Sequence, residues 1–451
     1  MLPRAKFHWL LKSRKRRCII VFIFILGCTA FLIPAFFGPS DSRLDTEAYR
    51  VHHRQLHHRV TRPISNAILN YTMVEMGFEQ RRKHLKQQCQ VLQYSYQCSE
   101  MEVKQHLAID IRHKLVYCAI EKIGSTFWKR IFQILNGIRN VSNPFDIQGL
   151  QAYKGYHTAD GLPFYTIHRI FKTFKKFMFV REPFERLLSG YVDKLFSPNA
   201  IFWNLGKFVV RKFRKKPTPQ SLECGHDVTF EEFVTYIVHS QKTGEGREPH
   251  FYAGFEHCRP CEIDYDYIGK LETFEDDTFF LMHEFNITDK VHFDDFQSET
   301  EDDAIIDAVD NVFLMKAAIV KCMSFSEALF RCFRKLQIRG ILSKDVQYPF
   351  PVNIDRDITI NEVKKAMFDL HAISGPSKER SKNRREALII AYSSLPLNLL
   401  ESIAEAVFHD TFLFGYDRFP LRTKETVKDI SFGYFSLPAF PKVKYGKHPQ
   451  N

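Results

Sequence analysis

The chain has 451 residues, of which 45% are hydrophobic, so it can fill the core of one large domain or of two ordinary ones. Its 64 lysines and arginines outnumber its 52 acidic residues and give a formal net charge of +12. Residues 1–17 carry seven of these positive charges and no acid, so the remainder is only mildly basic. This composition excludes a disordered chain.

A run without charged residues, 18–38, follows the basic tail. As a helix its 21 residues would extend about 31 Å, which matches the hydrocarbon thickness of a bilayer. A cleaved signal peptide is the alternative, but the run is long for one and lacks a small-x-small motif before Pro34. The sequence therefore predicts a cytosolic tail (1–17), a single transmembrane signal anchor (18–38) and a lumenal remainder, the type II topology. Three N-x-S/T sequons are compatible with it, at Asn70, Asn140 and Asn286.

The lumenal part is predicted to have three sections. Residues 39–88 are polar and rich in histidine and arginine, as expected of a stem that holds a domain away from the membrane. The domain itself is predicted at 89–420, with a C-terminal tail at 421–451. Within the domain, 340–390 is predicted to be an insertion, because residues 374–386 are charged and rich in helix breakers.

Eight cysteines follow the apolar run. An even number in an oxidising compartment favours disulfides, although their pairing cannot be deduced from their order. Cys258 and Cys261 form a C-x-x-C pair, which also fits zinc binding or redox chemistry. No second C-x-x-C or H-x-x-x-H lies nearby, so structural disulfides are predicted.

The first candidate site lies after residues 115–120, an apolar run typical of a buried strand. A helix is predicted to begin a few residues later. Between them, Gly124 allows the backbone to approach an anion, the amides of Ser125 and Thr126 point at it, and Lys122 adds a positive charge. The loop is not a Walker A motif, because its lysine precedes its only glycine.

The second candidate site follows residues 177–180, a further apolar run predicted to be a strand. Pro183 marks the first position of a helix whose apolar stripe packs on the sheet. Arg181 is left at the strand's carboxyl edge, where open α/β sheets bind ligands, and Arg186 and Ser189 follow it. Two guanidinium groups and a hydroxyl at a helix start suit a phosphate dianion. The alternative is an ordinary βα unit with solvated arginines.

The pattern R-x-P-x-x-R-x-x-S-x-Y of residues 181–191 resembles the segment that binds the 3′-phosphate of the sulfate donor in Golgi carbohydrate sulfotransferases. The residues Val-Arg-Glu-Pro-Phe-Glu-Arg-Leu of this segment are similar to those of the chondroitin and dermatan 4-sulfotransferase group. The loop at Lys122 resembles the 5′-phosphosulfate loop of the same enzymes, usually P-K-x-x-x-S/T/N-x-W, with Glu121 in place of the proline. A carboxylate there repels a phosphate unless it points away. Residues 258–272 and 410–416 also resemble the family.

The resemblance implies an α/β fold with a P-loop-like parallel sheet flanked by helices. It implies transfer of a sulfuryl group from 3′-phosphoadenosine 5′-phosphosulfate to a hydroxyl of a glycosaminoglycan or glycoprotein glycan, in a Golgi membrane protein with a lumenal catalytic domain. Arg181 and Ser189 are expected to bind the 3′-phosphate, with Arg186 supporting them. Lys122 is expected to be catalytic as well, by neutralising charge on the leaving phosphate oxygen. The scheme requires no metal. The residues expected around the 5′-phosphosulfate are Lys122, Ile123, Gly124, Ser125, Thr126 and Phe127.

Sulfuryl transfer to a sugar hydroxyl needs a general base, and two histidines, His157 and His168, lie between the two loops. His157 is predicted to be the base, because the family carries a histidine in roughly this region. The alternative for either residue is an ordinary core or surface histidine.

Two other functions remain open. Asp264 and Asp266 form a D-x-D pattern, which holds a metal ion and a nucleotide-sugar in Golgi glycosyltransferases, but this short signal leaves both phosphate loops unexplained. The second open function is that of a non-catalytic ectodomain that binds glycan through basic patches. Residues 211–216 form such a patch, which would also guide an anionic glycan to an enzyme. Nucleic acid is not expected as a partner on the lumenal side.

Overall fold

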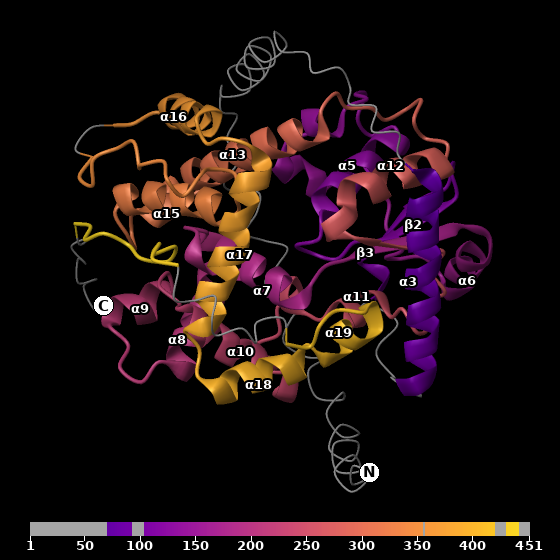
Figure 1. The fold of residues 1–451 in the computed structure, drawn as a ribbon, viewed down its shortest axis with the longest axis horizontal. Coiled ribbons are helices and arrows are strands. Elements are labelled where there is room, and N and C mark those ends of the chain that lie inside the picture. Colours follow the sequence, from indigo (N-terminus) through magenta and orange to yellow (C-terminus); the bar gives the residue numbers. More distant parts are fainter. Residues whose placement is uncertain (1–69, 93–102, 355–356, 420–429, 442–451) are drawn as a thin grey trace, which may run out of the picture. The chain divides into compact units, whose positions relative to one another are not determined.

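The computed structural model describes residues 70–92, 103–354, 357–419 and 430–441 (Figure 1). All of them belong to one compact unit, residues 68–451. The predicted cytosolic tail, the predicted transmembrane helix at 18–38 and the first part of the predicted stem lie outside the described residues.

Four strands form one sheet in the order β1-β2-β3-β4. Their bounds are β1 Leu107–Asp110, β2 Leu115–Cys118, β3 Lys175–Val180 and β4 Tyr267–Lys270. Strand β1 is antiparallel to β2, whereas β2, β3 and β4 are parallel to one another, with Cys118 opposite Met178 and Val180 opposite Lys270. Strands β2 and β3 are the two that the apolar runs predict. Since parallel strands end at the same edge, the loops after β2, β3 and β4 leave the sheet together.

Helices cover this sheet, and Figure 1 shows α3, α5 and α12 beside the strands. Helix α5 (Ser125–Leu135) begins where the sequence predicts and buries Trp128, Ile131 and Phe132 completely. The other helices of this half are α3 Tyr71–Leu92, α6 Phe164–Thr173, α11 Gly254–Cys258, α12 Phe274–Glu284 and α19 Phe408–Phe414. Short helices η4 Pro144–Asp146, η5 Gly149–Tyr153, η8 Pro249–Phe251 and η9 Leu271–Thr273 connect the elements.

Helix α3 contains residues 71–88, which the sequence assigns to the stem. It contacts β4 and α12, and the guanidinium of Arg81 bonds both the carboxylate of Asp277, at 2.6 Å, and Ile268 O, at 2.9 Å. Its last turn holds Cys89, which is disulfide-bonded to Cys261. In the structure this segment is therefore part of the folded unit. The sequence did not predict that the segment packs on the domain, because it is mostly polar and the helix buries only Phe78 and Leu85.

Helix α7 (Pro183–Tyr191) starts at Pro183 as predicted, and the carboxylate of Glu182 caps it by accepting from the amides of Phe184 and Glu185. A π-helical segment, η6 (Val192–Phe196), follows and leads into a second apolar core formed by helices. The remaining helices are η7 Ala200–Phe202, α8 Trp203–Phe213, α9 Pro219–Cys224, α10 Phe230–Thr243, α13 Phe296–Leu314, α14 Lys316–Ile319, α15 Phe325–Ile338, α16 Ile360–Ala372, α17 Ser377–Ser393 and α18 Leu397–Ala406.

One prediction needs correction. Residues 374–386, predicted to be a breaker-rich loop, are largely helix α17. Its Arg380 and Asn383 are buried and donate to the carbonyls of Gly340 and Leu342, so these polar side chains are satisfied inside the fold. The hydroxyl of Tyr392 donates to Phe184 O at 3.0 Å and links α17 to α7.

The disulfide prediction is confirmed. Cys258 pairs with Cys118 and Cys261 with Cys89, so the C-x-x-C cysteines bond to distant partners rather than to each other. A third disulfide joins Cys224 to Cys322, and Cys332 is a buried free thiol.

Within the described residues, no single helix is long and apolar enough to cross a bilayer, although α17 and α18 taken together meet that criterion across a bend of 116°.

Candidate functional site

The two loops predicted to bind anions meet at one edge of the sheet. The guanidinium Nη1 of Arg181, at the end of β3, donates to the backbone carbonyl of Lys122, in the loop after β2, at 3.3 Å. Its Nη2 lies 3.4 Å from Oε2 of Glu185, one turn into α7. Ser189 lies one further turn along, on the same face of the helix, and is half-buried. A single bound molecule can therefore reach both loops.

Arg186 links three segments of the chain through hydrogen bonds. Its side chain is buried and donates through Nε to Glu121 O at 3.0 Å, through Nη1 to Tyr252 O at 2.6 Å and, at 3.5 Å, through Nη2 to His250 O. Because all three acceptors are backbone carbonyls, this arginine fixes the positions of the first loop and of residues 250–252 relative to α7. The arrangement fits the supporting role that the sequence predicts.

The backbone of the first loop adopts an unusual conformation. Lys122 and Gly124 both have left-handed φ angles, 68° and 72°, and for a lysine this costs roughly 1–2 kcal/mol. Gly124 caps α5, so the amides of Ser125 and Thr126 have no acceptor one turn earlier in the helix. These are the free donors that an anion would use.

Two other residues predicted in this loop are placed differently. The side chains of Ile123 and Phe127 are buried in the apolar core. The amide of Phe127 donates to Gly124 O at 3.1 Å. Phe127 therefore shapes the loop through packing, with neither its side chain nor its amide left for a ligand.

The ammonium group of Lys122 is held by Asp193, at 2.8 Å. The same carboxylate binds Lys335 at 2.6 Å and Lys194 at 3.2 Å, so one half-buried anion serves three cations. Burial would raise the pKa of Asp193, but these three lysines hold it well below its usual range. Burial lowers the pKa of Lys122 to about 7, against the opposing effect of Asp193. Sequence reasoning missed Asp193 and Lys335, which lie in η6 and α15.

More guanidinium charge lies beside the second loop. Burial lowers the pKa of Arg384, and the positive charges of Arg181 and Arg339 lower it further. Arg384 belongs to α17, in the segment that the sequence treats as an insertion. The structure thus adds a cation whose charge is felt at Arg181 and which no motif indicated.

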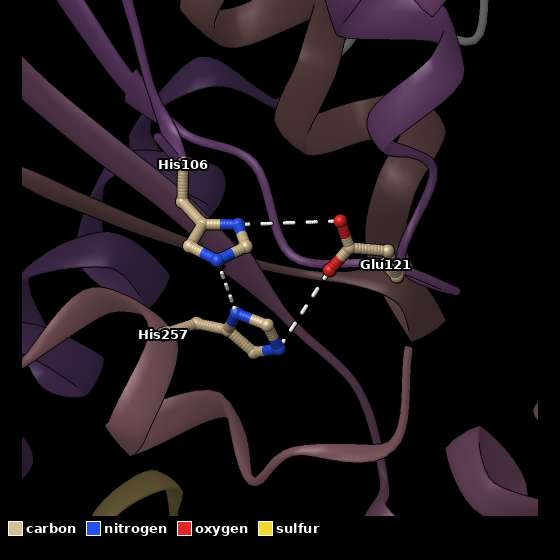
Figure 2. Close-up of side chains that lie close together, drawn as sticks. All are labelled: His106, Glu121 and His257. Atoms are coloured by element: carbon tan, nitrogen blue, oxygen red, sulfur yellow. Dashed lines mark hydrogen bonds and ion pairs between the residues drawn. The ribbon is translucent and has the colours of Figure 1, made fainter. Parts of the chain in front are cut away.

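Glu121, which replaces the proline of the resembling motif, faces two histidines (Figure 2). Its carboxylate lies 4.0 Å from Nδ1 of His106 and 3.6 Å from Nε2 of His257, whose Nδ1 is 3.1 Å from Nε2 of His106. Burial would raise the pKa of Glu121, but the positive charge of Lys129 opposes this effect, and the pKa lies below its usual range. Burial lowers the pKa of His257 to about 3, so this histidine is neutral. The charge of Glu121 is thus directed at the histidines.

These three residues are also the set that could hold a metal ion among the described residues, since their ligand atoms lie within 4.8 Å of one another. His257 Nε2 donates to Pro249 O at 2.8 Å, a bond that metal binding through this nitrogen would break. The D-x-D aspartates are engaged elsewhere. Asp264 pairs with Lys86 at 3.0 Å, and Asp266 pairs with Lys176 at 3.1 Å.

The histidine predicted to be the base lies beside the edge strand β1. His157 is exposed in a segment whose carbonyl accepts from Ile109 N of the edge strand β1, at 2.8 Å. His168 is exposed on α6 and stacks on Phe164. Among the interactions of the described residues, none joins either histidine to Lys122 or Arg181.

Comparison with known proteins agrees with this geometry. The model of the sulfotransferase family matches residues 105–311. Carbohydrate sulfotransferase 11 of Rattus norvegicus is 35% identical over 201 residues, which cover 43% of this chain and 57% of the relative. Carbohydrate sulfotransferase 9 of Homo sapiens is 30% identical over 232 residues, 50% of this chain and 51% of the relative. Carbohydrate sulfotransferase 14 of Danio rerio is 33% identical over 200 residues, which cover 43% of this chain and 52% of the relative.

The chain thus spans little more than half the length of these relatives, and no solved structure matches it. The matched region contains all four strands, both loops and α7, the elements that bring Lys122 and Arg181 together. Residues 105–311 of this chain therefore resemble the sulfotransferase family.

Proposed function

We propose that this protein is a carbohydrate sulfotransferase, which moves a sulfuryl group from 3′-phosphoadenosine 5′-phosphosulfate to a hydroxyl of a glycan. The observation that carries the proposal is the 3.3 Å hydrogen bond from Arg181 to the backbone of Lys122. It brings an ammonium loop and a guanidinium loop to one sheet edge, as a nucleotide with phosphates at both ends requires. The relatives' names supply the carbohydrate acceptor.

In this proposal Lys122 and the amides of Ser125 and Thr126 hold the 5′-phosphosulfate. As the sulfur–oxygen bond breaks, the ammonium group neutralises the charge that develops on the phosphate oxygen. Arg181 and Ser189 bind the 3′-phosphate, and Arg186 keeps the two loops in register through their backbones. Positioning and electrostatics carry the rate, as in phosphoryl transfer.

We further infer a P-loop-like sheet in a type II Golgi membrane protein, anchored by residues 18–38 and facing the lumen. The three disulfides suit an oxidising compartment, and the three sequon asparagines are exposed. An anionic glycan, such as chondroitin or dermatan, is the proposed acceptor class. Part of the basic run at 211–216 is already paired, Arg214 with Asp227 and Glu232, which leaves the exposed Lys215 and Lys216 to attract it.

The glycosyltransferase alternative loses support, because both D-x-D aspartates are occupied by lysines. It would require manganese dependence and a nucleotide-sugar donor. A non-catalytic glycan-binding protein would bind glycans and yield no product from either donor.

The test uses the purified full-length protein with radiolabelled phosphosulfate donor and a panel of chondroitin, dermatan and N-glycan acceptors. Lys122→Met and Arg181→Met should each remove transfer, while Lys382→Met, an exposed surface change on α17, should leave it intact. An unchanged rate in either loop variant would refute the assignment.

A further inference from the structure

A carboxylate and an imidazole form a dyad next to the Lys122 loop. At the start of η8, Oε1 of the capping residue Glu248 accepts from the backbone amide of His250 at 3.2 Å and lies 2.6 Å from its Nδ1. An ionised carboxylate only accepts hydrogen bonds, so Nδ1 of the neutral imidazole carries the proton and Nε2 keeps a lone pair. The side chain of His250 is 25% exposed, so its ring can be reached by another molecule.

The dyad is fixed to the candidate donor site from two directions. Arg186 binds the carbonyls of His250 and Tyr252 and, on its other side, Glu121 O in the first loop. A Cβ added at Gly190 of α7 would lie 2.7 Å from the ring of Phe251 and 3.9 Å from Cγ of Lys122. Phe251, the residue after His250, and the aliphatic part of the Lys122 side chain therefore both lie next to Gly190.

The ring of His250 also borders the lysine cluster. It packs edge-on against Phe202, with ring centroids 5.0 Å apart, and Nζ of Lys194 lies 4.7 Å from the centre of the Phe202 ring. Lys194 shares the carboxylate of Asp193 with Lys122. An acceptor hydroxyl beside this cluster would lie between the imidazole and the cations that hold the sulfate donor.

We propose that His250 is the general base for the acceptor hydroxyl and that Glu248 is a positioning residue that orients it. The inference rests on the proposed sulfotransferase function. Nε2 takes the proton of the acceptor hydroxyl, whose oxygen forms a bond to sulfur. The bond from sulfur to the phosphate oxygen breaks, and adenosine 3′,5′-bisphosphate leaves with its new charge against Lys122. The imidazolium then returns the proton to water.

The other histidines fit this role less well. No described residue forms a hydrogen bond with the ring of His157, which lies along the edge strand β1. His257 is fully buried and uses both ring nitrogens, towards Pro249 O and His106. His250 alone among these three combines a carboxylate partner, an accessible ring and a backbone tied to the donor loop.

The proposal predicts a definite pH dependence. Four charged groups face or border His250: Glu248 on its own segment, Glu121 on the loop after β2, Lys194 in η6 and Arg186 in α7. The two carboxylates favour the imidazolium, and the two cations oppose it. Glu248→Gln removes an anion at 2.6 Å, so the imidazolium becomes less favourable. The acid limb of kcat against pH should therefore move to lower pH.

The experiment compares His250→Gln, Glu248→Gln and His157→Gln in the full-length protein, with His168→Gln as the control. His250→Gln should lower kcat about 100- to 10,000-fold, the usual contribution of a general base, and leave the Kd for adenosine 3′,5′-bisphosphate within about threefold. Glu248→Gln should lower kcat with KM unchanged and shift the acid limb. His168→Gln should behave as the unmodified protein.

Full activity in His250→Gln, or a larger kcat loss in His157→Gln, overturns the assignment of the base and leaves the sulfotransferase proposal standing. Loss of nucleotide binding in step with kcat in both dyad variants shows a purely structural role and overturns it too. A protein that neither binds the bisphosphate nor transfers sulfate refutes the proposed function itself, and this inference with it.

Discussion

Replacing Asp193 by asparagine tests the lysine cluster most directly. The substitution keeps the shape of the side chain and removes the one anion that Lys122, Lys194 and Lys335 share. The side chains of Lys335, Lys194 and Lys122 are only 7%, 14% and 18% exposed, so their ammonium groups are largely shielded from water. Leaving buried cations without their partner costs about 3–5 kcal/mol.

This cost converts to a measurable shift in melting temperature. At about 2.1 cal/mol/K per residue, the unit of residues 68–451 unfolds with an entropy of about 0.8 kcal/mol/K, so Tm should fall by about 4–6 °C. Differential scanning fluorimetry of the full-length protein measures it. Asp264→Asn is the matched control, because this aspartate is 60% exposed, and its pairs with Lys86 and Arg82 should contribute no more than about 1 kcal/mol.

The same variant should gain more from a bound nucleotide than the unmodified protein does. Without Asp193 the phosphates no longer compete with a carboxylate for Lys122. The rise in Tm produced by adenosine 3′,5′-bisphosphate should therefore be larger in Asp193→Asn, most clearly at a pH well below 7, because the loss of Asp193 lowers the pKa of Lys122 further. An apo Tm within about 1 °C of the unmodified value would refute the reasoning, since it would mean that the cluster is not a buried ion network.

Two further predictions concern the buried histidine and the loop glycine. Burial holds the pKa of His257 at about 3, below the ordinary 6.5, so only the unfolded chain takes up this proton as pH falls below 6.5. Stability should then drop by about 2 kcal/mol from this group between pH 7 and pH 5, and His257→Gln should abolish that component in urea unfolding at the two pH values. Equal acid sensitivity in both proteins would contradict a neutral His257. Gly124→Ala places a Cβ 2.6 Å from the ring of Phe274 at a φ of 72°, whereas Gly161, at a φ of 75°, has open space. Gly124→Ala should thus destabilise by about 1–3 kcal/mol more than Gly161→Ala and should weaken bisphosphate binding, and equal effects would show that the ring yields freely.

Local patterns predicted the parts of the site that depend on neighbours in sequence. A short apolar run followed by Pro183 predicts a strand and the start of a helix, because both preferences act within a few residues. The same holds for Gly124, whose left-handed backbone begins α5. Since parallel strands end at one edge, the contact between Arg181 and Lys122 also followed from the pattern.

The remainder depends on packing between distant segments. Asp193 stands beside Lys194 and reads as an ordinary surface pair, but a π-helical turn places it against Lys335, 142 residues further along the chain. Helix α17 looks like a loop because the partners of Arg380 are Gly340 O and Glu301, which lie 40 and 79 residues away. The sequence alone does not reveal whether a charged side chain will find hydrogen-bonding partners inside the fold.

Arg186 has a consequence for how proteins built this way can diversify. Its guanidinium donates hydrogen bonds to the main-chain oxygens of Glu121, His250 and Tyr252 and not to their side chains. The distance between the nucleotide cradle and the neighbouring segment is thus set by main-chain atoms and does not depend on the side chains at those three positions. Lysine could not substitute for this arginine, because one ammonium cannot serve three carbonyls spread across the plane of a guanidinium.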